Sequence, residues 1–120
     1  MTGLGPVPNG EQAIVPREKF ERYVLSPDHP TGRHKASVFA DALGIHDVDW
    51  EYLADQLTKA AAGSSVVVIR ESAWGLSYEV ESLVHGLNGR SQPVISIWFA
   101  ARDPSGESAP RLITCYVAIP

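Results

Sequence analysis

The sequence predicts an α+β fold, in which two to three helices from the N-terminal half pack on a four-stranded, mainly antiparallel sheet from the C-terminal half. Apolar residues recur at helical spacing as far as about residue 60, and β-branched or alternating segments take over from residue 66. Short connections between these later segments favour antiparallel pairing. A chain of 120 residues has room for one such core.

The first 15 residues contain three glycines and two prolines, a composition typical of a flexible lead-in, so we place a single domain at residues 16–120. Pro16 suits the first turn of a helix, because its missing N–H would have no partner there. Phe20, Tyr23 and Val24 follow at helical spacing and form one apolar stripe. The segment SPDHPTG ends this first helix.

Two further helices are predicted before residue 64. The first runs from about Gly32 to Leu43 and stops at Gly44, and the second is capped by Asp47 or Asp49 and ends at Gly63. Their buried stripes are Ala36, Phe39 and Leu43 in the first, and Trp50, Leu53, Leu57 and Ala60 in the second. Because each stripe is one-sided, both helices need a surface to cover.

That surface is a sheet with strands at residues 66–69, 76–81, 94–100 and 112–119, separated in its second half by the turn HGLNGRSQ and the loop DPSGESAP. Alternation assigns these residues of the last two strands to the core: Ile95, Ile97, Phe99, Ile113, Cys115 and Val117. It assigns these to the opposite, open face: Ser96, Trp98, Leu112, Thr114 and Tyr116. Cys115 is therefore interpreted as a core residue and not as a nucleophile.

Composition excludes several kinds of function. The net charge of −4 is the opposite of what a general nucleic-acid binder carries. One cysteine and four scattered histidines give no metal-ligand spacing, so neither metal nor cofactor is expected. No apolar run reaches the roughly 20 residues that cross a bilayer, and no secretory signal is recognisable. A cytoplasmic location fits, either in the producing cell or in a target cell that receives a toxin.

The segment PDHPTGRHKA places cations at a helix start, where Arg33, His34 and Lys35 follow Gly32. Cations oppose the helix dipole there, and a bound anion such as phosphate would offset that cost. At about 100° per residue, Lys35 lies at the border of the apolar stripe and can reach into a cleft, whereas His34 faces water. The alternative is that both are ordinary surface residues.

The open face offers a second set of candidates. Trp98 or Tyr116 could stack a base, the Thr114 hydroxyl could donate to a phosphate, and Arg111 could hold a phosphate bidentately. Thr, Tyr and Trp are also favoured on any half-exposed strand face, and Arg111 could form an ordinary surface ion pair, so a purely structural role is the alternative.

Acidic residues favour a different function. If Glu79 and Glu81 share the open face, one could act as a general base, but both repel a polyanion. Residues 41–55 carry five acidic and no basic side chains: Asp41, Asp47, Asp49, Glu51 and Asp55. Such a helix could hold a basic protein, as in an immunity- or antitoxin-like module. A third alternative is a small anionic metabolite bound at the Gly32–Lys35 helix start.

Two segments, VPREKFERYVLSPDHPTGRHKASVFADALGI and PRLITCYV, together resemble a family of uncharacterised bacterial domains over about residues 15–118. The shared pattern is an Asn/Ser-Pro-x-His-Pro-x-Gly segment, a Lys-Ala-x-x-Phe stretch, a Leu-Gly helix end and a closing Pro-Arg-Leu-x-Thr strand. Matching positions are Pro16, Lys19, Tyr23, Leu25, Pro27, His29, Pro30, Gly32, Lys35, Ala36, Phe39, Leu43, Gly44, Pro110, Arg111, Leu112 and Thr114.

Members of that family occur as free small proteins and as C-terminal modules of large bacterial toxins, and their layout is similar to the barnase–EndoU–colicin–RelE group of metal-independent ribonucleases. The resemblance implies a toxin-like domain with RNA as substrate and a cognate immunity protein as partner. It also implies that Lys35 neutralises the phosphate, Arg111 clamps it and Thr114 hydrogen-bonds it. The resemblance further implies that His29 or His34 moves protons. From the helix start and the open face described above, we predict that substrate binding involves Gly32, Arg33, Trp98 and Tyr116.

Overall fold

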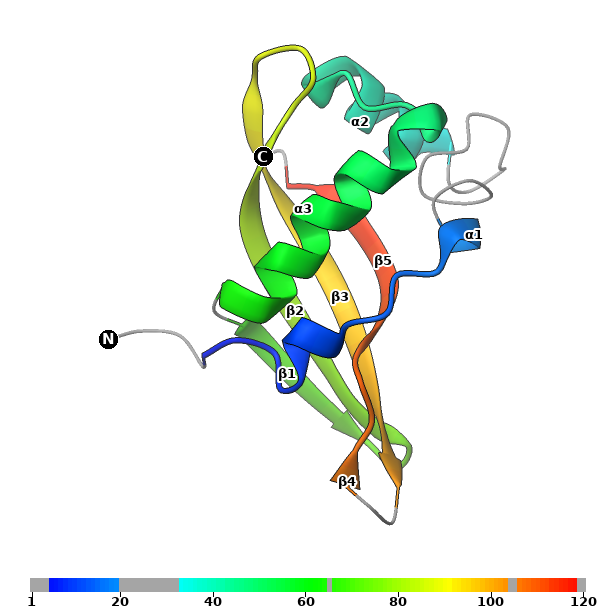
Figure 1. Ribbon diagram of the computed structural model, residues 1–120, viewed down its shortest axis with the longest axis vertical. Helices are drawn as coiled ribbons and strands as arrows, with labels where there is room; N and C mark the ends of the chain where they lie inside the picture. Colours follow the sequence, from blue (N-terminus) through cyan, green and yellow to red (C-terminus); the bar gives the residue numbers. More distant parts are fainter. Residues whose placement is uncertain (1–4, 20–32, 65, 104–105, 119–120) are drawn as a thin grey trace.

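The computed structural model describes residues 5–19, 33–64, 66–103 and 106–118, and it confirms the α+β class. Figure 1 shows helix α3 lying diagonally across one face of the sheet, with α2 near one end of that helix.

Within the described ranges, no helix has the length and apolar character needed to cross a membrane. The elements are η1 (Gly10–Gln12), α1 (Arg17–Lys19), α2 (Arg33–Leu43), η3 (Asp47–Asp49), α3 (Trp50–Gly63), β1 (Val66–Ser72), β2 (Gly75–His85), β3 (Ser91–Asp103), β4 (Gly106–Glu107) and β5 (Arg111–Val117).

The two long helices form as their apolar stripes predict. In α2 the buried side chains are Ala36, Phe39 and Leu43, and the helix ends at Gly44, whose φ of 66° favours glycine. In α3 Leu53, Leu57 and Ala60 are buried, as predicted, whereas Trp50, the fourth residue of the predicted stripe, is half-buried. Phe20, Tyr23 and Val24 of the first predicted helix lie outside the described residues.

The sheet has the order β1-β2-β3-β5, and every neighbouring pair is antiparallel, as predicted. The turn between β2 and β3 includes Gly89 with a φ of 85°, and the Asn88 side-chain oxygen accepts a hydrogen bond from the Arg90 N–H at 3.0 Å. The segment predicted as the loop DPSGESAP also contains β4, which pairs with Arg102 and Asp103 at the end of β3.

The face assignment predicted for β3 was wrong by one residue. The side chains of Val94, Ser96, Trp98 and Ala100 are fully buried beneath the helices. Ile95, Ile97 and Phe99 lie instead on the face away from α2 and α3, called the open face below, where they are only half-buried. The burial of Trp98 is compatible with its polar group, because its indole N–H donates to the Ser96 hydroxyl at 2.9 Å.

The face assignment for β5 was correct at its end and wrong at its beginning. Cys115 and Val117 are buried as predicted, whereas Leu112 is fully buried and Ile113 is 40% exposed. The cause is an irregularity in the pairing with β3: Ile97 pairs with Thr114 and Trp98 pairs with Leu112, so Ile113 is an extra residue between them. Such a β-bulge reverses the side-chain alternation from that point onward.

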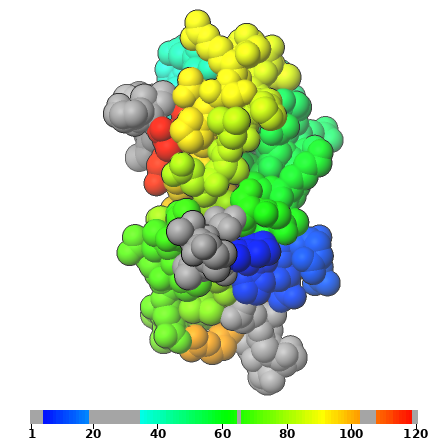
Figure 2. Space-filling model, turned by 90° about the vertical axis from the view of Figure 1, so that its left-hand side faces the viewer, coloured from blue at the N-terminus to red at the C-terminus, as the bar shows by residue number. Residues whose placement is uncertain are grey.

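The N-terminal segment is part of the packed domain, contrary to its assignment as a lead-in. Val7 is 3% exposed in the core, and its N–H donates to the Ala61 carbonyl at 3.2 Å. Ile14 bridges to the start of β5, where its N–H donates to the Pro110 carbonyl at 2.8 Å. Figure 2 shows the blue N-terminal residues packed against the green end of α3. This segment covers apolar surface that the last turn of α3 would otherwise leave exposed.

Candidate functional site

A lysine from α2 meets two residues of β5 at the edge of the sheet. The Lys35 ammonium donates a hydrogen bond to the Thr114 hydroxyl at 3.0 Å, and it lies 5.6 Å from the centre of the Tyr116 ring. The second distance is within the range of a cation–π interaction. We call these three residues the Lys35 cluster. It combines a cation, a hydroxyl and an aromatic ring from segments 79 residues apart.

The helix places Lys35 there through its rotation. Ala36 and Phe39 point into the core, so Lys35 and Val38, three residues apart, lie along the border of the buried stripe. Contacts of α2 run mainly to β5, which is at the end of the strand order. Lys35 can therefore reach past the strand edge to a side chain of the open face.

A shallow hollow of about 260 Å³ adjoins the Lys35 cluster. It is lined by Lys35, Val38, Tyr116 and Val117, so its walls are apolar apart from the ammonium group. Val38 is not among the predicted site residues, although its spacing of three residues from Lys35 is a signal that could have found it. The hollow therefore places apolar contact surface beside a cation.

The bulge in β5 brings Arg111 to the same face as Thr114. Simple alternation would put residues 111 and 114 on opposite faces, because they are an odd number apart. The register instead pairs Arg111 with Phe99 and Thr114 with Ile97, and these two β3 residues share the open face. Arg111 is exposed on this face. The face therefore carries one cation from β5, Arg111, and a second from α2, Lys35, which contacts the Thr114 hydroxyl of β5.

Carboxylates lie on the same face, two strands away. Glu79 is paired with Ile97 and Glu81 with Ile95, so both point to the open face. The Glu79 carboxylate lies 3.9 Å from the Arg70 guanidinium and its side chain is 22% exposed, whereas Glu81 is exposed. The open face therefore has cations on its β5 side, half-buried apolar residues along β3 and carboxylates on β2.

Cys115 lies on the other face of β5. Burial raises the pKa of its thiol to about 12, and the nearby Lys35 ammonium opposes part of that rise. The thiol is accordingly neutral at pH 7. The complete burial of Cys115 confirms its interpretation as a core residue. Among the described residues, no group of histidine, cysteine and carboxylate side chains could hold a metal ion.

Not every predicted site residue joins this arrangement. Trp98 was wrongly placed on the open face: its side chain has no exposed surface, so it is inaccessible to a base. His29 and Gly32 lie outside the described residues, as do the side chains of Arg33 and His34. The residues that the structure brings together are Lys35, Thr114 and Tyr116, with Arg111 on the same face.

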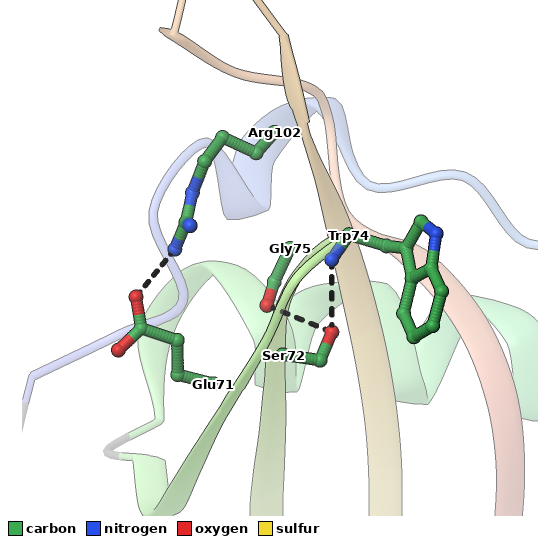
Figure 3. A network of polar contacts seen from close by, with 5 residues as sticks. All are labelled: Glu71, Ser72, Trp74, Gly75 and Arg102. Atoms are coloured by element: carbon green, nitrogen blue, oxygen red, sulfur yellow. Dashed lines mark hydrogen bonds and ion pairs between the residues drawn. The ribbon is translucent and has the colours of Figure 1, made fainter.

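A second exposed feature is the turn between β1 and β2, which presents Trp74 with 77% of its surface exposed. The Ser72 hydroxyl accepts a hydrogen bond from the Trp74 N–H and donates one to the Gly75 carbonyl, each at 3.3 Å. The Arg102 N–H donates to the Trp74 carbonyl at 2.9 Å, and the Arg102 guanidinium pairs with Glu71 at 2.6 Å. Figure 3 shows the indole projecting away from that ion pair, so a well-held turn carries a solvent-facing aromatic ring.

Comparison with known proteins gives a family and a fold. The family model described as "Domain of unknown function (DUF6883)" matches residues 6–119. A solved chain from a contact-dependent growth inhibition toxin–immunity protein complex of Klebsiella pneumoniae 342 is similar, with a TM-score of 0.68 and 20% identity over 87% of this chain and 98% of that chain. At that identity the likeness shows a shared fold. No curated protein matches the chain.

Proposed function

The chain belongs to the DUF6883 family of domains of unknown function, and from the geometry of its site we propose that it is a toxin-system domain that binds RNA at the Lys35 cluster and cleaves it without a metal ion. The observation that carries the proposal is the 3.0 Å contact between the Lys35 ammonium and the Thr114 hydroxyl. A cation and a hydroxyl at this separation can both bind the oxygens of one phosphate group.

Arg111 would add a second cation. It lies on the same face as Thr114, and a guanidinium binds phosphate oxygens through two parallel N–H groups. Together, Lys35 and Arg111 would stabilise the additional negative charge that develops on the phosphate oxygens in the transition state. This electrostatic contribution is what a metal ion would otherwise supply.

The reaction itself requires only proton transfers. The 2′-oxygen of the RNA attacks the adjacent phosphorus as a base removes its proton, and the bond from phosphorus to the 5′-oxygen breaks as an acid protonates that oxygen. The products are a 2′,3′-cyclic phosphate and a free 5′-hydroxyl. His29 and His34 are the proposed proton carriers because histidine titrates near neutral pH.

The fold comparison supports the toxin-system part of the proposal. The similar solved chain comes from a toxin–immunity protein complex, so a system of that kind is a reasonable setting for this domain. A domain with this function would act in a cytoplasm, of its own cell or of a target cell. It would also require a cognate protein that blocks the Lys35 cluster.

The direct test is incubation of purified protein with total RNA and transfer RNA in EDTA. We expect the wild-type protein to degrade RNA, and we expect Thr114→Val to lower the rate about 10–100-fold, because it removes a hydrogen bond to a charged group without changing side-chain shape. Thr114→Ser retains the hydroxyl and should keep most of the activity. An intact RNA pool after incubation with folded wild-type protein would contradict the proposal.

A second function, capture of a protein partner without catalysis, is favoured by Trp74. Exposed aromatic side chains are common anchors of protein interfaces, and this indole is held by a hydrogen-bonded turn. The acidic helix is a weaker anchor, because Asp55 pairs with Lys59 at 2.9 Å and Asp49 accepts a hydrogen bond from the His46 N–H at 3.0 Å.

Under this second function, Trp74→Ala should weaken binding of a partner isolated from the native host by about 30-fold or more, the size expected for an interface hot spot. The affinity of the purified pair is the quantity to measure. Leu83→Ala is the matched control, because Leu83 is also a large exposed apolar residue but lies on β2, away from the turn that carries Trp74. Equal affinities for wild type and Trp74→Ala would eliminate Trp74 as the anchor.

A further inference from the structure

Two rows of side chains run across the open face at right angles to the strands. Each row begins on β5, passes over β3 and ends on β2, as the pairing registers require. The first row is Thr114, Ile97 and Glu79, and the second is Tyr116, Ile95 and Glu81. Each therefore runs from a residue of the Lys35 cluster, over an apolar residue, to a carboxylate.

The dimensions of a row match those of a nucleotide. Neighbouring strands are about 4.8 Å apart, so the β5 and β2 side chains of one row are separated by about 10 Å. This is comparable with the distance from the phosphate of a nucleotide to the outer edge of its base. Adjacent rows are two residues apart, about 7 Å, which suits successive nucleotides of an extended strand.

The chemistry of each row follows the same direction. If Lys35 and Thr114 hold a phosphate, the sugar and base extend over the apolar side chains of Ile95 and Ile97, which are half-buried and face away from the helices. The base edge then meets a carboxylate. A carboxylate accepts hydrogen bonds and donates none, so it binds bases that present an exocyclic amino group, such as cytosine, and disfavours the two carbonyl oxygens of uracil.

From these rows we infer that Glu81, assisted by Glu79, selects single-stranded RNA whose bases carry exocyclic amino groups. The inference rests on the proposed function, since it takes the phosphate to lie at the Lys35 cluster. Glu81 is the main reader because it is exposed, whereas the Glu79 carboxylate lies near Arg70. Repulsion between these carboxylates and the phosphate is weak at about 10 Å, because salt screens charges over about 8–10 Å.

The test compares binding of two short single strands, cytidine and uridine hexamers with 2′-O-methyl groups, which prevent cleavage. Fluorescence anisotropy should show the wild-type protein binding the cytidine strand roughly tenfold more tightly. Glu81→Gln should bring the two affinities to within about threefold, because the amide can donate to uracil as well as accept. Glu51→Gln, which removes an exposed carboxylate from α3, is the control and should leave the ratio unchanged.

Each other outcome overturns the inference in a distinguishable way. Base selection is contradicted if the wild-type protein binds both strands equally, or if Glu81→Gln leaves the ratio of the two affinities unchanged. RNA cleavage in EDTA would still support the proposed function in that case. Equal gains in affinity for both strands, in Glu81→Gln and Glu51→Gln alike, would show that only general charge repulsion was relieved. Failure to bind either strand, together with an intact RNA pool, removes the proposed function as well.

Discussion

Replacing Lys35 by methionine should reduce RNA cleavage by about 100- to 1,000-fold, the loss expected when one group that stabilises transition-state charge is removed. Methionine has a similar length, so it can still line the hollow beside Val38, and it removes the ammonium group. The Thr114 hydroxyl would lose its 3.0 Å donor but would still be able to bind water at the sheet edge. The free energy of unfolding should therefore change little.

The measurement is the initial rate of RNA cleavage, with chemical denaturation as a check on folding. Lys59→Met is the matched control, because Lys59 is an exposed lysine on α3 that pairs with Asp55. It should cleave RNA at the wild-type rate. If the Lys59 and Lys35 variants lose activity equally, the effect would come from net charge, and the Lys35 cluster would lose its assigned role.

Replacing Trp98 by alanine should destabilise the domain by about 3–5 kcal/mol, the usual cost of removing a large buried aromatic side chain. Trp98 has no exposed surface and lies at the centre of β3, paired with Tyr78 on one side and Leu112 on the other. Because domains of this size are stable by only about 5–15 kcal/mol, this loss is a large fraction of the total stability.

Urea denaturation measures this directly, and the neighbouring Phe99→Ala provides the comparison. Phe99 is of similar size but lies half-buried on the open face, so its loss should cost clearly less. A loss below about 1 kcal/mol for Trp98→Ala would be typical of a surface residue and would contradict the buried position of Trp98.

The helices were predictable because their apolar residues occur on one side only. In α2 the stripe of Ala36, Phe39 and Leu43 carries the two largest apolar side chains, so it predicts the buried face, and the border position of Lys35 follows from rotation alone. The glycine after Leu43 also marked the helix end correctly, since a φ of 66° is costly for other residues.

The faces of β3 could not be predicted in the same way. Val94 to Ala100 is apolar at nearly every position, so alternation does not distinguish the buried face from the open one. Alternation with Ile95, Ile97 and Phe99 predicts Ser96 on the open face, yet Ser96 is buried and accepts a hydrogen bond from the Trp98 indole. The hydrogen bond between them inside the core offsets the free-energy cost of burying their polar groups.

By itself, the sequence determined the α+β class, the two helices and the number of main strands, because these depend on local periodicity and on glycines at turns. Only the tertiary structure decided which side of β3 faces the helices and that Arg111 shares a face with Thr114. A single extra residue, Ile113, reverses the alternation in β5, and its effect depends on pairing with a strand distant in sequence. The contact between Lys35 and Thr114 also depends on tertiary structure. Packing of α2 against β5 brings together two residues that no local sequence pattern connects.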